Sequence, residues 1–83
     1  MEAFIKNAAR ETFGSDVVVR NYGTDIGAWR LHVEIGAETG VGPALFIGQL
    51  LTRIDHIPHV EVTVRGQRPK GDAKIAYRQG VIL

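Results

Sequence analysis

Apolar side chains recur with a helical period in two segments of the chain. In residues 2–13, Phe4 and Ile5 share one arc with other apolar side chains, and the charged side chains lie on the opposite arc. A second helix is predicted to begin at Pro43, because proline suits the first helical position, and to end before Pro58. The apolar stripe of this second helix consists of Phe46, Ile47, Leu50, Leu51 and Ile54.

Other segments show the period of two that is typical of strands with one buried face. Apolar and polar residues alternate in 29–35, 60–65 and 73–78. Residues 17–19 are three consecutive valines, whose β-branched side chains also favour a strand. Turns that contain glycine, at 22–27 and 66–72, separate the strands of each pair. We therefore expect four strands, with Trp29 anchoring the core from an apolar strand face.

The order of these elements repeats along the chain. Residues 2–35 and 43–83 each read helix, strand, turn, strand, with Val-Val-Val-Arg at 17–20 and Val-Thr-Val-Arg at 62–65. The predicted fold class is α+β in the order α-β-β-α-β-β, with a four-stranded antiparallel sheet and two helices packed on one face. At this length the chain is predicted to form a single domain, 1–83, built from two αββ units.

Composition narrows the class of protein. The chain contains no cysteine, which excludes disulfides and thiolate metal sites. Its uninterrupted apolar runs are far shorter than the roughly 20 residues that a membrane span needs. The first residues lack the basic and then apolar design of a secretory signal. We expect a cytoplasmic protein with no membrane partner.

Basic side chains gather on the predicted polar face of the sheet. If the apolar strand faces point toward the helices, the opposite face carries Arg20, Arg30, His32, Glu34, Glu61, Thr63, Arg65, Lys74 and Arg78. Guanidinium groups donate paired hydrogen bonds to phosphates and carboxylates. The candidate binding residues are therefore the cations of this face and of the adjoining turn: Arg20, Arg30, Arg65, Arg68, Lys70, Lys74 and Arg78. The alternative is internal pairing, in which Glu34 and Glu61 neutralise neighbouring arginines.

Residues 55–61 contain two histidines and two carboxylates, which are residue types that bind zinc. Pro58 separates His56 from His59, so the two imidazoles do not share a helical face, and no H-E-x-x-H signature is present. Ser15 is the only serine, and a turn role suffices for it. We expect no metal, no cofactor and no catalytic residue, and we lean toward a protein that is not an enzyme.

The loop at 36–42 supports an alternative function. It precedes a helix, and backbone N–H groups at a helix start attract anions. The order strand, Gly-x-Gly loop, helix, strand, with Tyr77 further on, resembles the acetyl-CoA-binding half of the N-acetyltransferases. The resemblance implies that Gly40 and Gly42 face the pyrophosphate of the cofactor and that Tyr77 faces its thioester. Ala-Glu-Thr at 37–39 stands where that family carries a basic residue. The alternative function is thus a reduced acetyltransferase-like enzyme that binds a nucleotide-bearing cofactor.

Residues 81–83, Val-Ile-Leu, add an apolar segment that covers either the core or a second copy of the chain. Exposed apolar edges of small sheets invite pairing, and we expect a homodimer. The predicted function is a small non-enzymatic binding module whose basic sheet face docks on an acidic protein or a nucleic-acid backbone. An accessory role in phages or mobile elements is a candidate setting. A structural assembly subunit is the second alternative.

Overall fold

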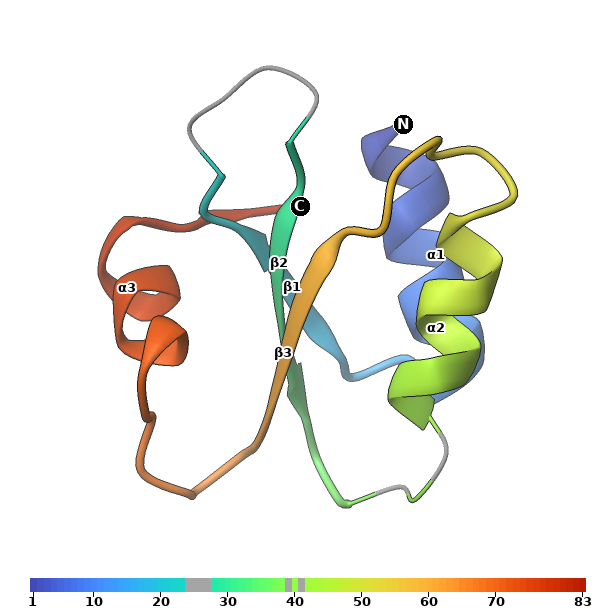
Figure 1. Ribbon diagram of the computed structural model, residues 1–83. Coiled ribbons are helices and arrows are strands. Elements are labelled where there is room, and N and C mark those ends of the chain that lie inside the picture. Colours follow the sequence, from blue (N-terminus) through green and yellow to red (C-terminus); the bar gives the residue numbers. More distant parts are fainter. Residues whose placement is uncertain (24–27, 39, 41) are drawn as a thin grey trace.

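The computed structural model of the chain describes residues 1–23, 28–38, 40 and 42–83. These residues form three helices and four strands (Figure 1). In chain order the elements are α1 (Glu2–Phe13), β1 (Val18–Asn21), β2 (Arg30–Ile35), α2 (Gly42–Leu50), β3 (His59–Val64), α3 (Asp72–Gln79) and β4 (Val81–Ile82). The fold is therefore α+β, as predicted, but it contains one more helix than the sequence pattern indicated.

The strands form one mixed sheet in the order β3-β2-β1-β4. The β1 strand pairs antiparallel with both β2 and β4, with Val19 opposite Val33 and Arg20 opposite Ile82. The β2 and β3 strands are parallel. The prediction of a purely antiparallel sheet was therefore wrong. In chain order α2 follows β2 and precedes β3, and it runs back along the sheet. The chain therefore enters β3 in the same direction as β2, which is the geometry of a crossover connection.

The predicted fourth strand, 73–78, is the helix α3. The spacing of small residues explains the difference. Ala73 and Ala76, three positions apart, are 3% and 0% exposed, whereas Ile75 is 44% exposed. A strand would bury Ala73 and Ile75 on the same face, but a helix buries positions separated by three or four. Alanine also favours a helix over a strand. The fourth strand is instead β4, which has only two residues.

The helices lie on both faces of the sheet. In Figure 1, α1 and α2 stand on one side of the strands and α3 stands on the other. The prediction of two helices on one face holds for α1 and α2 alone. The connection from β2 to β3 leads to the neighbouring strand at one edge of the sheet. The connection from β3 to β4 leads in the opposite direction, past β2 and β1 to the other edge. Crossovers between parallel strands are right-handed, so steps in opposite directions place their helices on opposite faces.

The hydrophobic core lies between the sheet and the pair α1 and α2. It consists of Ile5, Ala8, Ala9, Val19, Leu31, Val33, Ile35, Phe46, Leu50 and Ile54. The predicted facing of the strands is confirmed, since Leu31, Val33 and Ile35 are buried on this side. Trp29 is partly buried and packs against the core, in agreement with its expected anchoring role.

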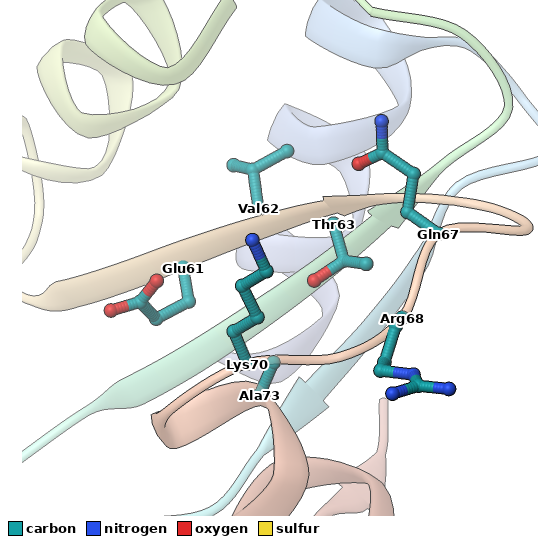
Figure 2. Close-up of a pocket in the computed structure, with 7 residues that line it drawn as sticks. All are labelled: Glu61, Val62, Thr63, Gln67, Arg68, Lys70 and Ala73. Atoms are coloured by element: carbon teal, nitrogen blue, oxygen red, sulfur yellow. The ribbon is translucent and has the colours of Figure 1, made fainter.

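The β3 strand forms one open edge of the sheet. The N–H of His59 donates to the Trp29 carbonyl at 3.2 Å, and the N–H of Arg65 donates to the Ile35 carbonyl at 2.7 Å. Because strand residues alternate in direction, Glu61 and Thr63 also hydrogen bond toward β2. The backbone groups of Val60, Val62 and Val64 therefore point outward. Figure 2, seen from this edge, shows Val62 on the α2 side and Thr63 on the α3 side.

Candidate functional site: the polar face under α3 and the open edge of β3

The candidate binding residues occupy three different places. Arg20, Arg30 and Arg65 extend from the strands on the face that α3 covers, Lys74 and Arg78 are exposed on α3 itself, and Arg68 and Lys70 lie in the loop between β3 and α3. The open basic sheet face that the sequence predicted does not exist among the described residues. The reason is that the segment taken as its fourth strand folds back over it as a helix.

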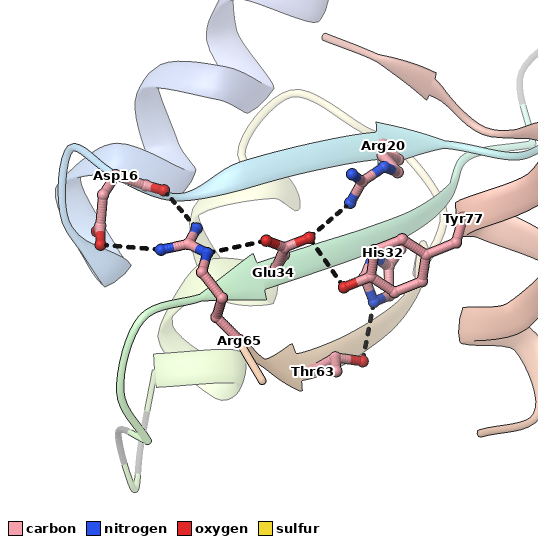
Figure 3. A network of polar contacts seen from close by, with 7 residues as sticks. All are labelled: Asp16, Arg20, His32, Glu34, Thr63, Arg65 and Tyr77. Carbon is pink, nitrogen blue, oxygen red and sulfur yellow. Dashed lines mark hydrogen bonds and ion pairs between the residues drawn. The ribbon is translucent and has the colours of Figure 1, made fainter. Parts of the chain in front are cut away.

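Glu34 is the centre of a polar network between this face of the sheet and α3 (Figure 3). Its Oε1 accepts hydrogen bonds from Arg20 at 3.0 Å and from the hydroxyl of Tyr77 at 2.8 Å. Its Oε2 accepts one from Arg65 Nε at 2.9 Å. The guanidinium of Arg20 also lies over the Tyr77 ring, 4.4 Å from its centre. Together these contacts fasten α3 to β1, β2 and the end of β3.

The donors around Glu34 stabilise its ionised form. Burial of the carboxyl by itself raises its pKa, but the hydrogen bonds from Arg65, Tyr77 and Arg20 outweigh burial and lower the pKa from 4.5 to about 2. Glu34 is therefore a carboxylate at all physiological pH values. It neutralises cations from two different strands, which is the internal pairing that the sequence left open as the alternative.

The other two strand arginines have internal partners as well. Arg65 donates from Nη2 to the backbone carbonyl of Asp16 at 2.9 Å, and its Nη1 lies 3.4 Å from the carboxylate of that residue. Arg30 donates to Asp72 at 3.1 Å. Three of the candidate cations are thus committed to intramolecular contacts. Arg65 joins the end of β3 to the α1–β1 turn, and Arg30 joins the first turn of α3 to β2. These side chains therefore stabilise the fold and do not bind an external anion.

His32 lies under α3 and is fully buried. Its Nε2 is 2.9 Å from the Thr63 hydroxyl, and its ring centre is 4.8 Å from that of Tyr77. Its Nδ1 is buried with no hydrogen-bond partner in the described part of the chain. Burial, helped by the nearby charge of Arg20, lowers the pKa of His32 below 6.5. The imidazole is therefore neutral at neutral pH, and protonating it places a second cation beside Arg20.

The two shifted groups predict how stability depends on pH. The unfolded chain binds a proton at His32 more readily than the folded chain, so the free energy of unfolding falls as the pH drops below about 6.5. A second loss follows between the ordinary Glu34 pKa of 4.5 and its folded value of about 2.

Urea unfolding at pH values from 7.5 down to 3 measures this dependence. The variant His32→Gln lacks the titrating group, so its curve is expected to stay flatter than that of the parent between pH 6.5 and the onset of the carboxylate transition. Equal slopes for the two proteins in that interval contradict the assigned role of His32.

Three side chains that could ligate a metal meet near the start of α3. His59 Nε2 lies 3.2 Å from Glu61 Oε1 and 3.1 Å from Asp72 Oδ2. One imidazole and two carboxylates are a donor set that Zn²⁺ or Mn²⁺ accepts. However, the same Asp72 oxygen accepts from Arg30 at 3.1 Å and from the Tyr22 hydroxyl at 3.4 Å. An arginine already supplies the positive charge there, so the cluster fastens α3 to the sheet. Sequence reasoning missed it because Asp72 comes from a distant segment.

A pocket of about 400 Å³ opens beside the β3 edge on the α3 side. Its lining residues are Glu61, Val62, Thr63, Gln67, Arg68, Lys70 and Ala73. In Figure 2 the side chain of Lys70 extends toward β3, while the guanidinium of Arg68 points the other way. Both cations are exposed, and neither forms an ion pair with any residue in 1–23, 28–38, 40 or 42–83. The pocket therefore presents positive charge that the fold itself does not neutralise.

A second pocket of about 280 Å³ lies on the opposite side of the same edge. Its lining residues are Ile35, Glu38, Gly40, Pro43, Val62, Val64 and Gln67. It is mainly apolar near the strand and shares Val62 and Gln67 with the first pocket. The open edge of β3 thus runs between a hollow that contains Lys70 and Arg68 and a hollow of mixed apolar and polar lining.

Two residues of the acetyltransferase resemblance, Tyr77 and Gly42, lie on opposite faces of the sheet. Tyr77 lies on α3 with its hydroxyl on Glu34, and Gly42 begins α2 on the other face of the sheet. A tyrosine and a glycine loop that the sheet separates do not face one bound cofactor. Gly40 lines the apolar pocket, while residues 39 and 41 of the loop lie outside the described residues.

No described helix combines the length and apolar character that a membrane span requires. Comparison of the chain with protein-family models, with curated proteins and with solved structures found no match. The function is therefore inferred from the geometry of the chain itself.

Proposed function

We propose that this chain is a small non-enzymatic binding module that recognises an acidic segment of a partner protein at the basic pocket beside β3. The observation that carries the proposal is the position of Lys70 and Arg68. Both line the pocket next to an open strand edge, and within the described residues no carboxylate forms an ion pair with either. Unpaired arginine and lysine beside a hollow are the groups that carboxylates bind.

The distribution of charge favours a protein over a nucleic acid. Binding a nucleic-acid backbone generally needs an array of cations along one surface. Here Arg20, Arg30 and Arg65 form ion pairs with carboxylates of the same chain. Arg20 is also largely covered by α3. The remaining exposed pair at the pocket suits a short acidic segment. Binding to a nucleic-acid backbone, the other partner class predicted from the sequence, is one outcome of the experiment below.

Binding to fluorescently labelled poly-L-glutamate, with single-stranded oligothymidylate as the competing probe, tests the proposal. The double variant Arg68→Gln, Lys70→Gln is expected to weaken poly-L-glutamate binding by about tenfold, which corresponds to the loss of two solvent-exposed ion pairs. The matched control is Lys6→Gln, Arg10→Gln, which removes the same charge from α1. Equal affinities of the two variants contradict the proposal. Binding of oligothymidylate without poly-L-glutamate identifies a nucleic-acid module instead.

The homodimer, the cytoplasmic location and the accessory role in phages or mobile elements stay predictions. The dimer is supported by the second edge of the sheet, where Val81 and Ile82 of β4 are 66% and 62% exposed. This edge lies across the sheet from the β3 pockets, so self-association at β4 leaves the proposed binding site accessible. The same exposed edge is what supports the alternative of an assembly subunit.

A further inference from the structure

We infer that the partner binds by adding a strand to the sheet beside β3, as an extended segment in which apolar and acidic residues alternate. This inference rests on the proposed function and specifies its binding mode. Recognition by strand addition takes affinity from main-chain hydrogen bonds and specificity from pockets for alternate side chains. The β3 edge offers both features.

The main-chain groups available for pairing are those of every second residue of β3, because backbone groups of successive strand residues point to opposite sides. His59 and Arg65, at its two ends, donate their N–H groups toward β2. The outward set is therefore Val60, Val62 and Val64. The Val64 carbonyl already accepts the N–H of Gln67 at 3.0 Å, which closes the far end of the edge. Within the part of the chain that the structure describes, no hydrogen bond engages the backbone groups of Val60 and Val62 or the N–H of Val64, so these groups can pair with an incoming strand.

The two pockets lie where alternate side chains of that strand would point. Neighbouring strands are about 4.8 Å apart, so an added strand lies directly between the two hollows. Its side chains on the α2 side meet Val62, Val64 and Pro43, which are the apolar part of a lining that also contains Glu38 and Gln67. Those on the α3 side meet Lys70, whose side chain extends toward β3, in a pocket that Arg68 also lines. A segment that alternates an aliphatic residue with glutamate or aspartate matches both sides at once.

Charge selects a partner protein over a second copy of this chain. In an antiparallel pair of β3 strands, Lys70 and Arg68 of both copies would gather on the α3 side. The only acid of β3 is Glu61, which lines the same pocket and is outnumbered there by Lys70 and Arg68. Lysine beside a strand edge disfavours pairing of like chains. An acidic segment removes that repulsion.

Capped peptides long enough to span the six residues of β3 test the inference. An alternating valine–glutamate peptide is expected to bind about tenfold more tightly than a peptide of the same composition in which the valines precede the glutamates. An alternating valine–lysine peptide is expected not to bind. Equal affinity of the alternating and blocked peptides overturns strand addition.

Methylation of the peptide backbone gives a second readout that leaves the protein unchanged. In an added strand, only every second N–H faces β3. If the added strand is antiparallel, methylating the valine nitrogens is expected to reduce affinity about tenfold. If it is parallel, methylating the glutamate nitrogens is expected to give the same reduction. The other set points to solvent and is expected to have little effect. Equal effects of both sets, or no effect of either, overturn the inference.

The outcomes separate this inference from the proposed function. If poly-L-glutamate and all acidic peptides bind regardless of order and methylation, the acidic-partner function stands and strand addition fails. If no acidic probe binds, both fail. A dimer in light scattering that excludes the peptide and dissociates on Val62→Pro shows that a second copy occupies the edge, which also overturns the inference.

Discussion

Replacing Glu34 with alanine is expected to lower the free energy of unfolding by about 2–3 kcal/mol. The carboxylate is 13% exposed and receives hydrogen bonds from Arg20, Arg65 and Tyr77. Its removal leaves the charge of Arg20, itself 15% exposed, without a counterion beneath α3. Arg65 is 43% exposed and recovers solvation, so the loss stays below that of a fully buried pair.

Thermal and urea unfolding of Glu34→Ala measure this effect. The control is Glu11→Ala, which removes an exposed carboxylate from α1 and is expected to change stability by less than about 0.5 kcal/mol. Tyr77→Phe removes only the hydroxyl donor and is expected to cost about 1 kcal/mol. If Glu34→Ala is no less stable than Glu11→Ala, the network does not hold α3 to the sheet.

Replacing Phe46 with alanine is expected to cost about 3–5 kcal/mol. Phe46 is fully buried where α2 meets the sheet, and its ring packs edge-on against Phe13 with the ring centres 5.7 Å apart. The substitution leaves a cavity that the surrounding helices fill only partly. For a domain of 83 residues, with a total stability of about 4–12 kcal/mol, this loss removes at least about a quarter of the free energy of unfolding.

The neighbouring Leu45 supplies the matched control. It lies on the same helix but is 58% exposed, so Leu45→Ala is expected to change stability by less than about 1 kcal/mol. Circular dichroism across a urea series distinguishes the two variants. Similar midpoints for both would show that α2 does not pack on the sheet through Phe46.

Sequence reasoning succeeded where the pattern depends on neighbours along the chain. The period of apolar residues at 2–13 gave the bounds of α1, and alternation in 29–35 gave both β2 and its buried face. It failed at 73–78, where the alternation of Ala73, Ile75 and Tyr77 with the residues between them fits a short strand as well as a helix. There the decision came from what the segment covers, since α3 buries Ala73 and Ala76 against the sheet.

The candidate site was predictable only in part, for the same reason. Arg68 and Lys70 were correctly expected in a turn after the third strand, and the structure places them beside a pocket there. Arg20 and Arg65 were expected to face an external partner but have carboxylates of the chain itself beside them. Pairing of that kind joins residues far apart in sequence, as with Arg65 and Asp16, 49 positions apart. The sequence left the pairing of arginines with Glu34 open as an alternative, but it contained no signal for the contact between Arg65 and Asp16.

The sequence by itself determined which residues of α1 and β2 face the core, because burying alternate or helically spaced apolar side chains is a local requirement of each element. Only the tertiary structure decided which charges remain free and which strand lies at the edge. Both depend on the order of strands in the sheet and on the side to which each crossover returns. A charged side chain is available to a partner only where the fold brings no opposite charge of the same chain beside it.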